Sequence, residues 1–190
     1  MSKIFRLSFV LLLITAVTGI ILGGVQTITA EPIRLTKERE HREALEITLP
    51  GATEFKMLKI GTDPKGMIKE INIGTAGSEL VGYNFNVLTK GYGGLMELVV
   101  GIGKEGQVKG IKILVLNETP GLGGEATAPK FLNQFKNKIV QKFDVIKTPS
   151  NKDTQIQAIS GATITSDAVV DGVNEAVDFW NKNFKEEGAK

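Results

Sequence analysis

The sequence predicts an α+β protein in which a mostly antiparallel sheet is packed by helices and preceded by one N-terminal transmembrane helix. Three observations predict this fold. Short runs alternate apolar and polar residues, as half-buried strands do, and they succeed one another without the long crossovers that a parallel sheet needs. A run with apolar residues at helical spacing closes the chain, and a run without charge opens it.

The opening run has the length of a membrane helix. Residues 7–25 carry no charge and would span roughly 28 Å as a helix, close to the thickness of a bilayer's hydrocarbon core. Lys3 and Arg6 precede the run, so the positive-inside rule places the N-terminus in the cytoplasm. A cleaved signal peptide is the alternative, but its apolar region is typically only about 7–15 residues long. We therefore expect a single-pass protein of the cell (inner) membrane with its domain on the extracytoplasmic side.

The rest of the chain divides into two further segments. After the membrane anchor at residues 1–30, we expect a juxtamembrane helix and linker at 31–53 and a folded domain at 54–190. Thr36 has the hydroxyl that helix N-caps favour, and a charged stretch comes directly after it. The juxtamembrane helix is therefore predicted to begin there as a separate element.

Strand-like runs fill the first part of the domain: residues 55–60, 67–73, 80–89, 95–102 and 108–116. The stretch 101–106 also matches the G-x-G-x-x-G pattern of dinucleotide-binding sites. That pattern needs a helix to open directly after it, whereas residues 107–113 read as another strand. We therefore predict a hairpin turn at these glycines and no dinucleotide site.

Two helices are predicted to pack on the sheet. The first covers residues 127–138, and a short strand at 143–146 comes after it. The second, at 165–185, is the clearest element, because its apolar residues recur at helical spacing. Thr165 or Ser166 is expected to cap this helix.

The composition excludes several classes of protein. The chain has no cysteine, which excludes disulfides, thiolate metal sites, iron–sulfur clusters and c-type haem attachment. Its single histidine, His41, excludes a histidine-rich metal site. The net charge of +2 comes from Lys3 and Arg6, because basic and acidic residues are equal in number over residues 31–190. A neutral domain is a poor nucleic-acid binder, so we exclude a nucleic-acid partner.

Two segments are candidate binding sites. Residues 160–166 hold four hydroxyl side chains separated by small residues, just before the last helix. A helix N-terminus offers unpaired N–H groups to a phosphate, although a hydroxyl-rich helix cap explains this segment equally well. Residues 117–124 combine Pro120 with glycines that let the backbone approach a ligand closely, although a plain connecting loop is the simpler interpretation.

Residues 160–163, Ser-Gly-Ala-Thr, resemble the S/T-G-A-T flavinylation motif of FMN-binding subunits in two membrane complexes. One is the G subunit of the Rnf electron-transport complex, and the other is the C subunit of the sodium-translocating NADH:quinone reductase. Residues 91–94, 99–102, 118–123 and 158–166 all resemble blocks of the Rnf G subunit, in the same order. The N-terminal helix and the compact chain length also resemble the Rnf G subunit.

The resemblance implies FMN joined through a phosphoester to the last threonine of the motif, which is Thr163 here. The residues expected around the flavin are Ser160, Gly161, Ala162 and Thr165 at the attachment point, and Glu118, Thr119, Gly121, Leu122 and Gly123 in a loop over the ring. Leu122 is expected to cover the ring, and Thr119 to hydrogen-bond its edge. A separate flavin transferase is expected to make the bond, because no adjacent histidine or cysteine activates Thr163.

The resemblance further implies an electron-carrier subunit that works with other membrane subunits of the complex. Such complexes couple electron transfer between ferredoxin and NAD to ion translocation. No general acid, base and nucleophile stand together in the sequence, so we expect an electron relay and not a self-contained catalyst. The alternatives are the quinone-reductase subunit and an anchored extracytoplasmic binding protein without redox function.

Overall fold

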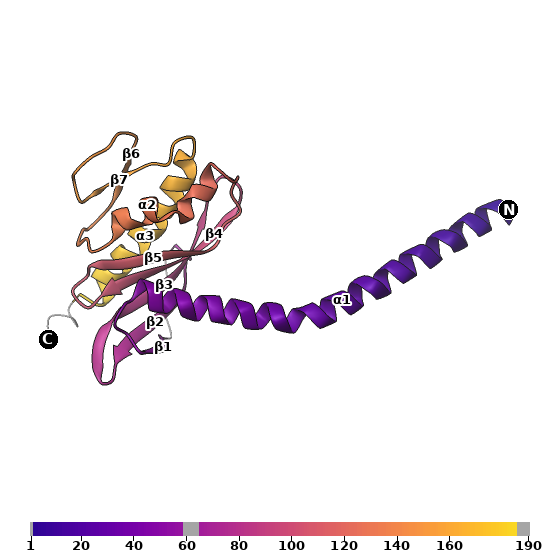
Figure 1. Cartoon of the computed structure of the whole chain (residues 1–190), viewed down its shortest axis with the longest axis horizontal. Coiled ribbons are helices and arrows are strands. Elements are labelled where there is room, and N and C mark those ends of the chain that lie inside the picture. Colours follow the sequence, from indigo (N-terminus) through magenta and orange to yellow (C-terminus); the bar gives the residue numbers. More distant parts are fainter. Residues whose placement is uncertain (1, 59–64, 186–190) are drawn as a thin grey trace. The chain divides into compact units, whose positions relative to one another are not determined.

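The chain begins with one long helix, α1 (Ser2–Thr48), drawn in indigo to violet in Figure 1. The computed structural model describes residues 2–58 and 65–185. It divides into two compact units, Met1–His41 and Arg42–Lys190. The first unit is the N-terminal part of α1, and the second is the folded domain together with the last turns of that helix.

The prediction that a separate helix begins at Thr36 is wrong, because Thr36 lies inside α1. This helix also continues through Pro32. Arg34 explains part of this continuity. Its guanidinium pairs with Glu31 and with Glu38, each at 2.6 Å, and such pairs at i±3 and i±4 stabilise a helix. Ion pairs therefore span the boundary at which the break was expected.

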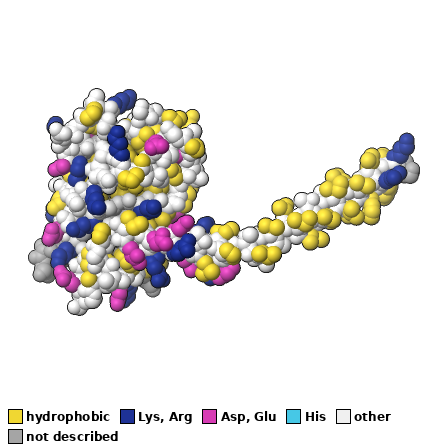
Figure 2. All heavy atoms as spheres, in the orientation of Figure 1, with side chains coloured by type: hydrophobic (Ala, Val, Ile, Leu, Met, Phe, Trp, Pro, Cys, Tyr) yellow, Lys and Arg dark blue, Asp and Glu magenta, His cyan; other side chains and the backbone are white. Residues whose placement is uncertain are grey.

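The first unit is a candidate membrane span. Within the described residues, α1 is the one helix long and apolar enough to cross a bilayer, judged by length and composition. Figure 2 shows hydrophobic side chains along most of this helix and basic side chains near its start. The predicted N-terminal transmembrane helix is therefore confirmed as a helix with the length and composition of a membrane span.

The folded domain is built on one antiparallel sheet whose strands lie in chain order: β1 (Glu54–Leu58), β2 (Ile68–Ala76), β3 (Glu79–Lys90), β4 (Leu95–Gly103) and β5 (Val108–Val115). The predicted runs match these strands closely, although residues 59 and 60 of the first run lie outside the described part. The predicted hairpin turn is also confirmed, since the Gly103 N–H donates to the carbonyl of Gln107 at 2.9 Å. The α+β class with a mostly antiparallel sheet is therefore confirmed.

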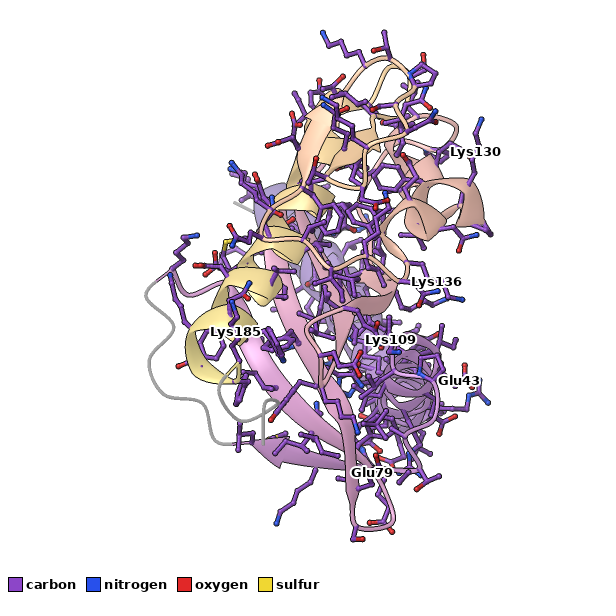
Figure 3. All side chains as sticks on the ribbon, turned by 90° about the vertical axis from the view of Figure 1, so that its left-hand side faces the viewer. Glu43, Glu79, Lys109, Lys130, Lys136 and Lys185 are labelled. Atoms are coloured by element: carbon purple, nitrogen blue, oxygen red, sulfur yellow. The ribbon has the colours of Figure 1, made fainter. Side chains whose placement is uncertain are left out.

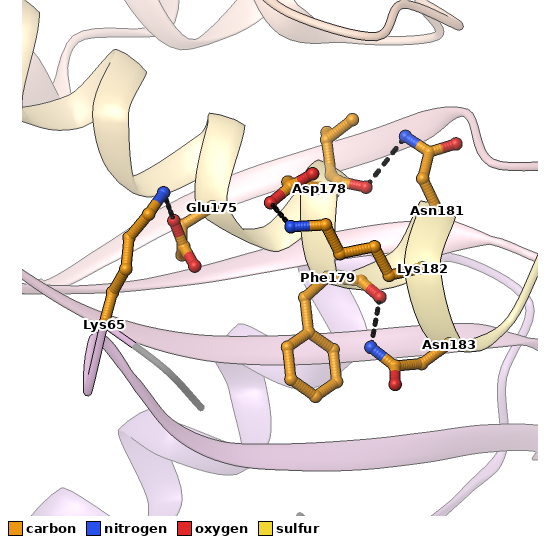
Figure 4. Close-up of polar contacts among 8 residues, drawn as sticks. Lys65, Glu175, Asp178, Phe179, Asn181, Lys182 and Asn183 are labelled. Carbon is orange, nitrogen blue, oxygen red and sulfur yellow. Dashed lines mark hydrogen bonds and ion pairs between the residues drawn. The ribbon is translucent and has the colours of Figure 1, made fainter. Parts of the chain in front are cut away.

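Helix α3 (Thr163–Asn183) covers one face of the sheet, and the main hydrophobic core lies between them. The helix end is fixed by aromatic packing, because Phe184 stacks on Tyr83 of β3 with ring centroids 4.2 Å apart. Midway along α3, the buried Glu175 pairs with Lys65, as Figure 4 shows. The helix is thus held on the sheet at two points.

The last turns of α1 lie on the opposite face of the sheet, a contact that the sequence did not predict. The Thr48 hydroxyl lies 2.9 Å from the side-chain oxygen of Asn84, whose amide donates to the carbonyl of Leu45 at 3.1 Å. Glycines make this close approach possible. A Cβ at Gly101 would overlap the Thr48 carbonyl oxygen, and one at Gly110 would lie 3.2 Å from the Thr48 Cα.

A compact connection joins β5 to α3. It contains η1 (Gly123–Thr127), α2 (Pro129–Leu132), η2 (Asn133–Phe135) and the parallel pair β6 (Asp144–Ile146) and β7 (Gln155–Gln157). The regular helix predicted at 127–138 is therefore wrong. Asn137 has a φ of 60°, its N–H donates to the carbonyl of Val108 at 2.7 Å, and Lys138 forms a bridge with Val108. Pairing with β5 ends the helical segment early.

Candidate functional site

A tight turn leads into α3. The Ala162 N–H donates to the carbonyl of Ile159 at 3.0 Å, which closes the turn. Gly161 has a φ of 75°, in the left-handed region that glycine adopts at little cost. The helix then begins at Thr163, so the motif 160–163 forms the turn and the first helical residue.

Neither Thr165 nor Ser166 caps the helix, so that prediction is wrong. The residue at the N-cap position is Ala162, which has no side-chain oxygen to offer. The Ser166 hydroxyl instead donates to the Ala162 carbonyl at 2.9 Å and accepts the Ile159 N–H at 2.9 Å. Both hydroxyl residues are buried within the first turns, where Ser166 holds the preceding turn against the helix.

The N-terminus of α3 is open. The first backbone bond into the helix is from the Ser166 N–H to the Ala162 carbonyl, at 3.0 Å. Among the residues that the structure describes, none accepts a hydrogen bond from the backbone N–H of Thr163, Ile164 or Thr165. Unpaired N–H groups at the positive end of a helix dipole favour an anion, above all a phosphate.

Two clefts meet at this open end, and Gly161 and Thr163 line both of them. The first, here called the loop cleft, has a volume of about 520 Å³ and is lined by Tyr92, Glu118, Thr119, Leu122, Gly123 and residues 161–165. The second, the lysine cleft, measures about 660 Å³ and is lined by Glu125, Ala128, Lys130, Phe131, Gln134, Lys147, residues 157–161 and Thr163. Thr163 is half-buried on the ridge between them.

The loop cleft has an apolar rim. Tyr92, Ile164 and Leu122 are 76%, 56% and 46% exposed, so three large side chains with apolar surface border one cleft. The loop that carries Leu122 is folded back on itself, since the N–H groups of Leu122 and Gly124 donate to the Thr119 carbonyl at 3.2 and 3.0 Å. The rim can therefore receive a flat apolar group above the open end of α3.

The lysine cleft is more polar and has a fixed wall. The Gln134 side chain accepts the Gln157 N–H at 2.7 Å and donates to the Gln157 carbonyl at 3.2 Å. The side-chain amide thus pairs with the backbone of β7 as a neighbouring strand would. The charged side chains of this cleft are Lys130, Lys147 and Glu125, and Figure 3 shows Lys130 projecting outward from α2. Its net positive charge suits the anionic part of a ligand.

The structure brings most of the predicted site residues together. Gly161, Ala162, Thr163, Thr165, Glu118, Thr119, Leu122 and Gly123 line the loop cleft, and Ser160 lines the lysine cleft. Gly121 lines neither cleft. Sequence reasoning missed Tyr92 and Ile164, although Tyr92 belongs to one of the glycine-rich blocks. It also missed Lys130 and Lys147, for which the sequence offers no signal.

Comparison with known proteins agrees with this geometry. The model of the FMN-binding domain family matches residues 91–178, which contain both clefts. The chain is 32% identical to the G subunit of the Na(+)-translocating ferredoxin:NAD(+) oxidoreductase complex of Acetobacterium woodii, over 93% of this chain and 91% of that protein. It is 34% identical to the G subunit of the proton-translocating ferredoxin:NAD(+) oxidoreductase complex of Clostridium ljungdahlii, with the same coverage.

Two solved structures share the fold. The C subunit of the Na(+)-translocating NADH-quinone reductase from Parabacteroides distasonis superposes with a TM-score of 0.58 at 17% identity, over 78% of this chain and 94% of that one. NqrC of Shewanella oneidensis gives a TM-score of 0.51 at 19% identity, over 77% and 73%. The sequence relatives, in contrast, are G subunits matched over nearly their whole length. The chain therefore belongs to the family of G subunits of the ion-translocating Rnf-type oxidoreductase complexes.

Proposed function

We propose that this chain carries FMN as a phosphoester on Thr163 and relays electrons between other subunits of a membrane-bound Rnf-type complex. An FMN electron-carrier role follows from the family and its FMN-binding domain. The observation that supports Thr163 is its position: it is the first residue of α3, at the open N-terminus where both clefts meet. Ferredoxin and NAD would be the terminal redox partners of the complex, coupled to ion translocation.

The rival hydroxyls are less suitable for attachment. Ser166 is fully buried and uses its hydroxyl in two hydrogen bonds. Thr165 is 1% exposed, so an enzyme could not reach it easily. Ser160 is exposed, but it lies within the turn, three residues before α3 begins, and it lines only the lysine cleft. Thr163 combines access from both clefts with a position beside those groups.

The loop cleft suits the flavin ring. Leu122 and Tyr92 would cover the ring with apolar surface, and Thr119 would hydrogen-bond its edge. The phosphate on Thr163 would lie beside the open helix N-terminus, with Lys130 and Lys147 on its other side. When bound, FMN supplies the redox chemistry, and the protein supplies position and electrostatics.

A separate enzyme would make the bond. An unactivated threonine hydroxyl is a weak nucleophile, and the described residues that line the two clefts include no histidine or cysteine that could act as its base. We therefore propose that a flavin transferase attaches FMN on the extracytoplasmic side, after α1 has anchored the chain in the cell membrane with its N-terminus in the cytoplasm.

The test is peptide mass spectrometry of residues 153–182 from native membranes, compared with Thr163→Ala. The wild-type peptide should carry FMN on Thr163. A protease added to intact cells whose outer envelope layers have been removed should release this flavin peptide. Thr163→Ala should lose all covalent flavin, remain folded and stop electron flow through the complex. Thr148→Ala, an exposed threonine in the preceding loop, is the matched control and should keep full flavin content. Flavin on another residue, or release only after cell lysis, would contradict the proposal.

A further inference from the structure

Glycines from two segments close around the carboxyl group of Glu118. Gly91 lies in the turn between β3 and β4, and Gly123 is the first residue of η1, which follows β5. A Cβ at Gly91 would overlap the Glu118 Oε1, and one at Gly123 would lie 2.6 Å from Oε2. Any side chain at either position would displace the carboxylate, so both glycines leave room for it.

A third glycine holds the carboxylate in place. The Gly93 N–H donates to the Glu118 Oε1 at 3.1 Å, and a Cβ at Gly93 would overlap the carbonyl oxygen of Asn117. The turn that carries Gly93 is itself closed, because the Gly91 N–H donates to the Gly94 carbonyl at 2.9 Å. The position of the carboxylate is therefore fixed by main-chain geometry, and not by a flexible side-chain partner.

This carboxylate faces the site. Glu118 is half-buried and lines the loop cleft, where it is the one charged residue in the described lining. No lysine or arginine in the described part of the chain forms an ion pair with it. The negative charge is thus not neutralised locally, and a half-buried charge is screened less by water and salt than an exposed one.

We propose that Glu118 sets the reduction potential of the flavin by holding a fixed negative charge beside its ring; this rests on the proposed function. An electron taken from a reduced partner subunit adds one negative charge to the ring unless a proton accompanies it. The carboxylate repels that charge, so it makes reduction less favourable and lowers the potential. The three glycines are explained together as the frame that keeps this charge at one distance from the ring.

A purely structural role for Glu118 is the alternative, and one substitution separates the two. Glu118→Gln keeps the oxygen that accepts the Gly93 N–H and keeps the shape of the side chain, but it removes the charge. A structural role would therefore be preserved, and the electrostatic role would be lost. Glu105→Gln is the matched control, because it removes an exposed carboxylate that lines neither cleft.

The experiment is an equilibrium redox titration of the full chain in detergent, with dithionite as reductant and flavin absorbance as readout. Glu118→Gln should shift the midpoint potential in the positive direction, and Glu105→Gln should leave it near the wild-type value. Glu118→Asp keeps the charge and should shift the potential less than Glu118→Gln. If the glutamine variant carries no flavin, Gly91→Ala decides the matter, because it displaces the carboxylate and should move the potential of the flavinylated chain.

The outcomes are distinct. An unchanged potential in Glu118→Gln overturns the proposal. An equal shift in Glu118→Gln and Glu105→Gln also overturns it, because that would show a general effect of net charge. A wild-type chain without flavin on Thr163 in the mass spectrum would contradict the proposed function itself, before any potential is measured.

Discussion

Two glycine-rich stretches look alike in the sequence and differ in what their glycines contact. In the hairpin at 101–106, the glycines face the protein: a Cβ at Gly101 would overlap the Thr48 carbonyl, and one at Gly106 would lie 2.6 Å from the Trp180 ring. In the loop at 121–124, a Cβ at Gly121 would meet nothing within 4 Å, and one at Gly123 would meet Glu118 and Thr165, which line the loop cleft. The first stretch closes two packed interfaces, and the second borders an open cleft.

The spacing of glycines does not by itself identify a binding site. The 101–106 hairpin has the spacing of a dinucleotide fingerprint, but its glycines let a helix approach each face of the sheet. The 121–124 loop has no such spacing, yet it forms a wall of the loop cleft. The next element in the chain, a strand in one case and short helical turns in the other, distinguishes the two.

The largest effect should come from Gly101→Ala in the hairpin. The added Cβ would overlap a main-chain oxygen at the end of α1, which cannot rotate away, so the helix must move. Overpacking of this kind costs about 3 kcal/mol, the upper part of its usual range. We expect a melting temperature roughly 10 °C lower for the full chain in detergent. The fluorescence of Trp180, the single and buried tryptophan, reports unfolding of the domain alone.

The flavin content of Gly101→Ala should fall only in proportion to the folded fraction, because Gly101 lies outside both clefts. A variant with wild-type stability would show that the end of α1 does not pack on the sheet as described. The variant Gly19→Ala, in the part of α1 where a Cβ meets nothing within 4 Å, is the control and should melt like the wild type.

A smaller loss of stability, with a specific effect on the flavin, is expected from Gly123→Ala. The new Cβ would lie 2.6 Å from the Glu118 Oε2 and 2.8 Å from the Thr165 Oγ1, so it would push both side chains into the loop cleft. We expect about 1 kcal/mol of destabilisation, in the lower part of the range for overpacking, because the added atom meets side chains and not the main chain. The flavin absorbance or its incorporation should change at the same time.

Gly121→Ala is the matched control within the same loop. Gly121 has a φ of 76° but open space around it, so alanine there costs about 1 kcal/mol of backbone strain and leaves the cleft unchanged. We expect the two variants to have similar stability. Only Gly123→Ala should alter the flavin absorbance or its incorporation. A normal flavin spectrum in both variants would show that the loop only connects β5 to the following elements and does not contact the flavin.

The sheet and the last helix could be predicted because their signals are local. Alternation marks each strand, and apolar spacing marks α3. The packing of the last turns of α1 on the sheet could not be predicted from the sequence. It depends on Thr48, Asn84 and glycines, none of which shows a hydrophobic pattern. The helix at 127–138 failed for a related reason, since long-range pairing of Asn137 with Val108 overrides local helical preference.

The site could be predicted in part. The motif at 160–163 and the loop at 118–123 were recognisable in sequence, and the fold places both on the loop cleft. Lys130 and Lys147 could not be found, because lysines are common at surfaces and only the fold brings these two to one cleft. The start of α3 was also misplaced, since its hydroxyl residues bond backward to the turn and do not cap the helix.

The smallest effect should come from Lys104→Gln, which changes the hairpin at 101–106 without touching its glycines. Lys104 pairs with Glu79 at 2.8 Å, and this contact lowers the pKa of the Glu79 carboxyl and raises the pKa of the Lys104 ammonium. Both side chains are exposed to solvent, so water and salt screen the pair strongly. We expect a melting temperature at pH 7 within error of the wild type. That result would show that the hairpin depends on its glycines and not on this ion pair.

The pH dependence of the same pair has a definite sign. A lowered pKa of Glu79 in the folded state means that its stabilisation is lost as pH falls through that pKa, and a raised pKa of Lys104 means a loss as pH rises through it. Any difference between wild type and Lys104→Gln should therefore be confined to the range between the two pKa values and should vanish in high salt. Melting curves at acid, neutral and alkaline pH, each at low and high salt, measure this. A large difference at neutral pH that persists in salt would show that the hairpin depends on its charges as well as on its glycines.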